Sequence, residues 1–241
     1  MPNNSESRRN FLRAGLVMIP TVTLGSYGLT QPTSATAETI RDDAPKSNAA
    51  YQPSFFSQEE WAFVHAACAH IIPNDESGAG AIEAGVPEFL DRQMETPYAY
   101  GGNWYMQGPF ISDQAPELGY QLKLTPRDIY RLGIRECNAW CQKEHGKPFA
   151  DLPADAQLEV LKQLDDDKIA LDSLKGSLFM AYLVKNTKEG YFADPIYGGN
   201  KDMVGWKMIG FPGARADFMD WIDHPNERYP LGPVSISGER G

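Results

Sequence analysis

Apolar residues recur every three or four positions in five stretches of the chain, which is the spacing of an amphipathic helix. The first stretch begins at a capping box, in which Ser57 is the N-cap and Glu60 the N3 residue, and Pro73 ends it. The five predicted helices cover residues 57–72, 86–94, 125–146, 154–164 and 173–187. A sixth, shorter helix is predicted over 214–222, and no segment alternates apolar and polar residues as a strand would. The pattern therefore predicts one small all-α domain of five or six helices.

Two segments, 97–121 and 190–213, lose the helical period and are rich in aromatic, glycine and proline residues. Flexible linkers rarely carry so many rings, so we interpret 97–121 as a long ordered loop. Rings on a non-periodic segment either fold back onto the chain's own core or face a partner. Interfaces are enriched in Tyr, Trp, Phe and Met, all of which occur in 190–213. The candidate partner-contacting residues are Tyr191, Phe192, Pro195, Tyr197, Asn200, Trp206, Lys207, Phe211 and Pro212.

The N-terminus has the pattern of an export signal. Arg8 and Arg9 stand side by side shortly before Phe11 and Leu12, which is typical of a twin-arginine signal. This route carries folded proteins across the inner membrane, often after they have bound a cofactor or a partner. We therefore expect a periplasmic protein that uses the twin-arginine translocase.

An apolar stretch, 14–29, follows the arginines and leads to a small-x-small cleavage site at Ala35 and Ala37. An ordinary secretory signal or a membrane anchor is the alternative. A spanning helix, however, needs about 20 unbroken apolar residues, and this stretch contains a proline. The sequence thus predicts a signal peptide over 1–37, a flexible polar leader over 38–53 and a helical domain over 54–241.

The chain is acidic, with a formal net charge of −10. The predicted signal contains three arginines and one glutamate, so the mature chain would carry −12. Such a surface argues against nucleic acid and against anionic lipid as binding partners.

The cysteines and histidines leave three alternatives open. In an oxidising periplasm, Cys68 could form a disulfide with Cys137 or Cys141, which leaves one thiol over. All three cysteines could instead be buried free thiols. The third alternative is a metal or redox site built from two clusters, each on one predicted helix. Those clusters are His65, Cys68 and His70, and Cys137, Cys141 and His145.

Motifs of catalysis and cofactor binding are missing from the sequence. It contains no dinucleotide fingerprint, no nucleophile elbow, no phosphate loop and no haem-attachment motif. Asp217, Asp220 and Asp223 recur every three residues without the glycine and glutamate of a calcium loop, so they indicate a solvated helix face. We expect no catalytic site, metal or cofactor in this chain.

Four segments resemble the small subunit, subunit 3, of gluconate 2-dehydrogenase-type membrane-bound sugar and sugar-acid dehydrogenases. The longest is GYFADPIYGGNKDMVGWKMIGFPGAR at 190–215. The others are FFSQEEWAFVHAACAHIIPND at 55–75, GAIEAGVPEFLD at 80–91 and HPNERYPLGPVSI at 224–236. The twin-arginine signal agrees with this resemblance.

The resemblance implies a non-catalytic accessory role within an oxidoreductase complex. In such complexes a large subunit, similar to glucose–methanol–choline flavoproteins, holds FAD and oxidises the sugar. A multihaem cytochrome c subunit passes electrons to ubiquinone and anchors the complex at the inner membrane. The small subunit carries the export signal that the flavin subunit lacks, and it supports that subunit's maturation. A stand-alone periplasmic metal or redox protein remains the alternative.

Overall fold

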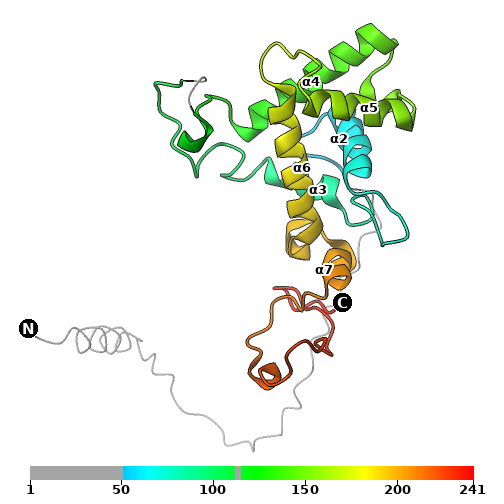
Figure 1. Ribbon diagram of the computed structural model, residues 1–241, viewed down its shortest axis with the longest axis vertical. Helices are drawn as coiled ribbons and strands as arrows, with labels where there is room; N and C mark the ends of the chain where they lie inside the picture. The colour runs from blue at the N-terminus through cyan, green and yellow to red at the C-terminus, as the bar shows by residue number, and fades with distance from the viewer. Residues whose placement is uncertain (1–50, 112–114) are drawn as a thin grey trace, which may run out of the picture. The chain divides into compact units, whose positions relative to one another are not determined.

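The computed structural model describes residues 51–111 and 115–241, and this part of the chain is helical (Figure 1). Its α-helices are α2 Gln58–Ile71, α3 Val86–Gln93, α4 Pro126–His145, α5 Ala154–Asp165, α6 Gly176–Phe192 and α7 Val204–Ile209. Its short 3-10 turns are η1 Pro116–Leu118, η2 Phe149–Asp151, η3 Pro195–Tyr197, η4 Lys201–Met203 and η5 Met219–Trp221. Only isolated bridges, and no strand, occur in the described ranges. The all-α prediction is confirmed.

Local capping explains where the helices begin. The Ser57 hydroxyl accepts the Glu60 amide at 3.3 Å, and the Glu60 carboxylate accepts the Ser57 amide at 2.8 Å. Thr125 and Asp128 form the same reciprocal pair at the start of α4. Both capping signals stand in the sequence, which is why these two starts could be predicted.

The core forms around α6, which contacts α2, α3, α4 and α5 (Figure 1). The Phe63 ring lies 4.5 Å from the Phe149 ring and 5.9 Å from the Phe179 ring, and Tyr130 meets Phe179 edge-on at 6.0 Å. All four side chains are almost wholly buried. Burial of such large aromatic surfaces is the main source of stability in a domain of this size.

Asp91, on α3, fixes the segment that leads into α2. Its buried carboxylate accepts the backbone amides of Ser54, Phe55 and Phe56 at 2.7–3.0 Å, and the hydroxyls of Tyr51 and Ser54 at 2.8 and 3.0 Å. Burial acts to raise the pKa of Asp91, but these hydrogen bonds to the charged form outweigh it and lower the pKa below its usual value. Asp91 is therefore a buried, fully paired anion.

The helix prediction needs three corrections. First, α6 continues five residues beyond the predicted end, to Phe192. The added turn of α6 packs against the Phe89 ring of α3. A Cβ at position 190 would lie only 2.7 Å from that ring, so the close contact needs Gly190. Second, α7 was not predicted.

Third, the helix predicted over 214–222 is wrong, since only the turn η5 forms there. The Asp217 carboxylate accepts the Met219 amide at 3.1 Å and starts a tight turn in place of a helix. Phe218, Met219 and Ile222 are exposed, so no buried apolar face stabilises a helix at this place.

The predicted loop 97–121 is held at its base by Trp104. The indole lies 6.0 Å from the Tyr98 ring, 5.2 Å from the Tyr120 ring and 6.3 Å from the Tyr182 ring on α6. Further out, Tyr105 is 81% exposed.

The predicted signal residues Arg8, Arg9, Phe11 and Leu12 and the cleavage-site residues Ala35 and Ala37 lie outside the described residues. Within the described residues, no helix combines the length and the apolar character needed to cross a bilayer.

Candidate partner interface

Asn200 organises the chain between α6 and α7. Its fully buried side chain donates from Nδ2 to the Ala193 carbonyl at 2.9 Å and accepts the Gly205 amide at Oδ1 at 2.8 Å. The backbone of Asn200 is left-handed, with φ 47°, a conformation that asparagine tolerates better than most residues. One side chain thus joins the residue that follows α6 to the first turn of α7.

Two glycines bring this segment directly against the end of α6. A Cβ on Gly199 would lie 2.2 Å from the Gly190 carbonyl oxygen, and one on Gly205 would lie 2.3 Å from the Tyr191 carbonyl oxygen. Because these obstacles are backbone atoms, they cannot move aside as a flexible side chain could. The segment 193–209 is therefore fitted to α6 by backbone contact.

Electrostatic contacts attach the same segment to α3. Lys201 pairs with the Glu88 carboxylate at 2.5 Å, and Arg92 pairs with its other oxygen. Glu88 is largely buried, and its two cationic partners offset the cost of burying its charge. The Lys201 amide also donates to the Ala84 carbonyl at 3.0 Å.

Three of the nine candidate partner-contacting residues are buried and hold this arrangement together. The Trp206 indole donates to the Phe192 carbonyl at 2.8 Å, and the Tyr191 hydroxyl donates to the Ala79 carbonyl at 2.6 Å. Asn200 is the third. In this structure their contacts are with the chain itself, so they position the segment.

The other candidates face outward to different degrees. Phe192, Tyr197 and Phe211 are 38%, 51% and 46% exposed, Lys207 is exposed, and Pro195 and Pro212 are half-buried. Three further apolar residues that were not predicted are at least half exposed: Ile196, Met208 and Ile209. We call the following residues the exposed apolar set: Phe192, Ile196, Tyr197, Met208, Ile209 and Phe211.

A weak sequence signal for the missed residues exists. Trp206 lies inward on α7, whereas Met208 and Ile209 lie outward, and Gly210 ends the helix in a left-handed conformation. The run from Trp206 to Gly210 is one helical turn closed by a glycine, which is a recognisable C-terminal signal.

The predicted disulfide is not formed, because all three cysteines are free and buried. The Cys68 sulfur lies 3.5 Å from the Thr187 hydroxyl on α6, and burial raises its pKa to about 12. Cys137 lies one turn from Cys141 on α4, and its hydrogen bond to Cys141 together with burial raises its pKa. Burial thus favours the protonated form of Cys68 and Cys137, whereas the hydrogen bond with Cys137 lowers the pKa of Cys141. All three cysteines are buried and free, so the alternative of buried free thiols holds.

The alternative of a metal site receives no support from the geometry. His65 packs on Trp61, His70 bonds to Gln157 at 2.9 Å, and His145 is an exposed residue beside Trp140. Across the described ranges, no group of three or more His, Cys, Asp or Glu side chains is placed to hold a metal ion.

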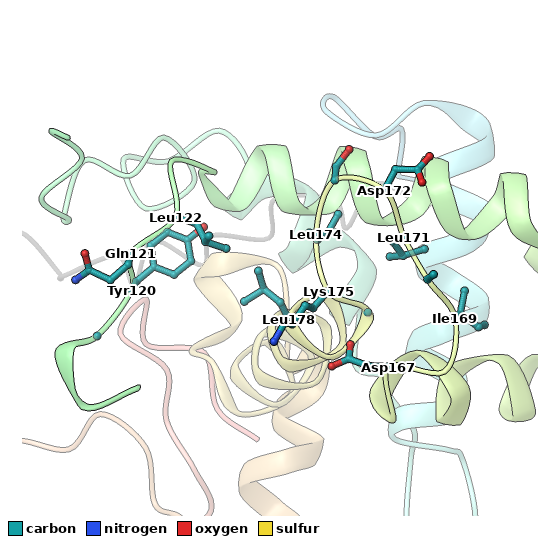
Figure 2. A pocket seen from close by; sticks show the side chains of 14 residues that line it. Tyr120, Gln121, Leu122, Asp167, Ile169, Leu171, Asp172, Leu174, Lys175 and Leu178 are labelled. Carbon is teal, nitrogen blue, oxygen red and sulfur yellow. The ribbon is translucent and has the colours of Figure 1, made fainter. Parts of the chain in front are cut away.

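A hollow of about 790 Å³ lies between residues 119–122 and the connection from α5 to α6 (Figure 2). Its apolar lining includes Leu122, Leu174 and Leu178. Among its polar residues, Asp167 is committed to the start of α6, where it accepts the Ser177 amide and hydroxyl at 2.8 and 2.7 Å. The residues that line this hollow include no histidine or cysteine, and the hydroxyl and amide of its Ser173 both donate to the Glu136 carboxylate.

Comparison with known proteins identifies the family. Residues 58–213 match the family described as gluconate 2-dehydrogenase subunit 3. No curated protein and no solved structure matches the chain. The matched range begins at the first residue of α2, contains the six α-helices of the described residues and the whole exposed apolar set, and covers more than half of the chain. The chain therefore belongs to the gluconate 2-dehydrogenase subunit 3 family.

Proposed function

We propose that this chain is the non-catalytic small subunit of a periplasmic, FAD-dependent dehydrogenase complex that oxidises a sugar or sugar acid. In this proposal it binds and stabilises the flavin-containing large subunit. The observation that carries the proposal is the exposed apolar set, which lies within the family-matched range and is held in one conformation by buried contacts.

The rigidity of the segment favours binding. Asn200, Trp206 and the glycine contacts fix the backbone before any partner arrives, so little conformational entropy is lost on association. Aromatic anchors in an interface can each contribute about 2 kcal/mol or more. Phe192, Tyr197 and Phe211 are the rings available for this role.

The export step follows from the twin-arginine pair. The large subunit takes up FAD in the cytoplasm, binds this chain and crosses the membrane as a folded passenger of the signal at Arg8 and Arg9. This chain contributes no cofactor. A multihaem cytochrome c subunit receives the electrons and holds the complex at the inner membrane.

Co-expression of the full chain with its large subunit tests the proposal. The double change Arg8→Lys with Arg9→Lys should leave both proteins in the cytoplasm, whereas Arg13→Lys, in the same basic region, should not. Purification through a tag on this chain should recover the large subunit with flavin absorbance. Export of the large subunit with the Arg8/Arg9 variant would contradict the passenger role, and a colourless chain recovered alone would contradict the stable complex.

A further inference from the structure

Residues 214–232 form a loop whose two ends are fastened together. The Ala214 amide donates to the Val234 carbonyl at 2.7 Å, and the Val234 amide donates to the Pro212 carbonyl at 3.2 Å. The junction needs glycine at 213, because φ is +76° there and a Cβ would lie 2.2 Å from the Val234 carbonyl oxygen. The loop thus leaves and returns at one point.

That point is tied to the end of α6. Asp194 accepts the Ile236 amide at 2.7 Å with one carboxylate oxygen and the Ile196 amide at 3.1 Å with the other. Asp194 is largely buried. The base of the loop is therefore attached to the same segment that carries the exposed apolar set.

The loop is packed by its own side chains. The Tyr229 ring lies 5.3 Å from the Phe218 ring and 5.6 Å from the Trp221 ring, and the Arg215 guanidinium lies 5.1 Å from its centre. Close ends and an internal side-chain cluster are also features of Ω-loops, shorter surface loops that often carry function.

The tip of the loop exposes apolar side chains among carboxylates. Met219 is 72% exposed and Ile222 is 64% exposed, although both are large apolar residues. Asp217, Asp220 and Asp223 alternate with them in sequence and are exposed. Residues 214–232 contain four carboxylates and two arginines, so the loop carries a net negative charge.

We propose that loop 214–232 is a second docking element for the large dehydrogenase subunit, which receives the tip in an apolar pocket bordered by arginine or lysine side chains. This inference rests on the proposed function. The alternation of apolar and acidic residues is complementary to such a pocket, and the acidic charge disfavours an anionic membrane.

A further observation supports the assignment to the same partner. The loop is continuous with the exposed apolar set, since a hollow of about 270 Å³ is lined by Trp206 and Phe211 on one side and by Tyr229 and Leu231 on the other.

The test measures the dissociation constant of the full mature chain for its purified large subunit at low and high salt. Met219→Ser with Ile222→Ser should weaken binding about tenfold or more, since both side chains would lose a buried site. The matched control is Tyr105→Ser with Leu118→Ser, which removes exposed apolar side chains from the other long loop and should leave binding unchanged.

A charge variant examines the border of the pocket. Asp217→Asn, Asp220→Asn and Asp223→Asn together should slow association several-fold at low salt and reduce the salt dependence of the rate. Asparagine at 217 keeps an oxygen that can accept the Met219 amide, so the turn is retained. The control with the same change in charge is Glu76→Gln, Glu144→Gln and Asp165→Asn, all exposed residues of the bundle.

The outcomes separate this inference from the proposed function. Weakening by Ile209→Ser with Phe211→Ser, but not by the tip variant, would retain the proposed function and overturn the docking role of the loop. Tight binding by both variants would overturn the docking roles of the loop and of the exposed apolar set, whereas a wild-type chain that does not bind the large subunit would overturn the proposed function. Binding of the wild-type chain, but not the tip variant, to phosphatidylglycerol–phosphatidylethanolamine vesicles, with unchanged affinity for the large subunit, would assign the tip to the membrane and overturn the inference.

Discussion

The helical bundle, residues 51–192, and the C-terminal segment, residues 193–241, use apolar side chains in opposite ways. In the bundle, the apolar residues of the helices lie mostly in one buried core. In the C-terminal segment, ten large apolar side chains are exposed, whereas only Met203 and Trp206 are buried. The bundle therefore uses its apolar surface to fold, and the C-terminal segment leaves most of its apolar surface available for binding.

The C-terminal segment must then be held by other interactions. They are the buried side chains of Asn200 and Asp194, the Trp206 indole bond and the backbone contacts at Gly199 and Gly205. Hydrogen bonds to buried groups are directional, whereas apolar burial is not. This difference explains how a segment can be well positioned without a large core of its own.

The largest effect should come from a matched pair of phenylalanines. Phe179→Ala, in the bundle core, should lower the free energy of unfolding by about 3–5 kcal/mol, because it leaves a cavity. Phe211→Ala, in the exposed apolar set, should cost about 1 kcal/mol or less while it weakens binding to the large subunit. Urea denaturation and a binding titration measure the two quantities. Equal losses of stability would show that the two regions do not differ as proposed.

Asp91→Ala should destabilise the bundle next most strongly, by about 3 kcal/mol. The substitution removes the carboxylate that accepts hydrogen bonds from five donor groups. It leaves the buried amides of Phe55 and Phe56 unpaired. Asp128→Ala, in an exposed capping box, is the control and should cost about 1 kcal/mol. Thermal unfolding followed by circular dichroism compares the Tm of the two variants. Equal decreases in Tm would mean that the buried carboxylate of Asp91 stabilises the protein no more than the exposed carboxylate of Asp128.

Asn200→Ala should act on the C-terminal segment and spare the bundle. It removes two buried hydrogen bonds and places alanine at φ 47°, a local cost of about 2 kcal/mol. The control is Asn226→Ala, because Asn226 also has a positive φ, 66°, but is exposed. Hydrogen exchange should show faster exchange over 193–213 in the first variant alone. Faster exchange throughout α2–α6 would show that the two regions unfold together.

The sequence predicted the bundle better than the C-terminal segment, and the reason is the range of the interactions. Helices α2 and α4 carry capping boxes and apolar periods that act over a few residues. By contrast, α7 has only six residues and follows residues with positive φ, so it has no comparable start signal. Its position depends on contacts with the end of α6, which no local pattern reveals.

The candidate interface was predicted as a segment but not residue by residue. The abundance of rings in 190–213 indicated where to look, yet ring content does not say which rings are buried. Trp206 is inside because Gly205 lets the backbone approach Tyr191, and Phe211 is outside because the chain turns at Gly210. The disulfide was the wrong one of the three cysteine alternatives for a related reason, since the Cys68 thiol lies against the Thr187 hydroxyl of α6.

The smallest predicted effect is a pH dependence that belongs to the bundle. The pKa of Asp91 is lowered in the folded state, because the hydrogen bonds it accepts outweigh its burial. Its contribution to stability is therefore complete above its unfolded pKa of about 3.9 and is lost as the pH falls through the lower folded value. Asparagine at 91 cannot ionise, so the difference in unfolding free energy between wild type and Asp91→Asn should narrow below about pH 4. A difference that stays constant from pH 7 to pH 3 would mean that Asp91 is not a charged anchor, and that directional polar contacts matter less to the bundle than to the C-terminal segment.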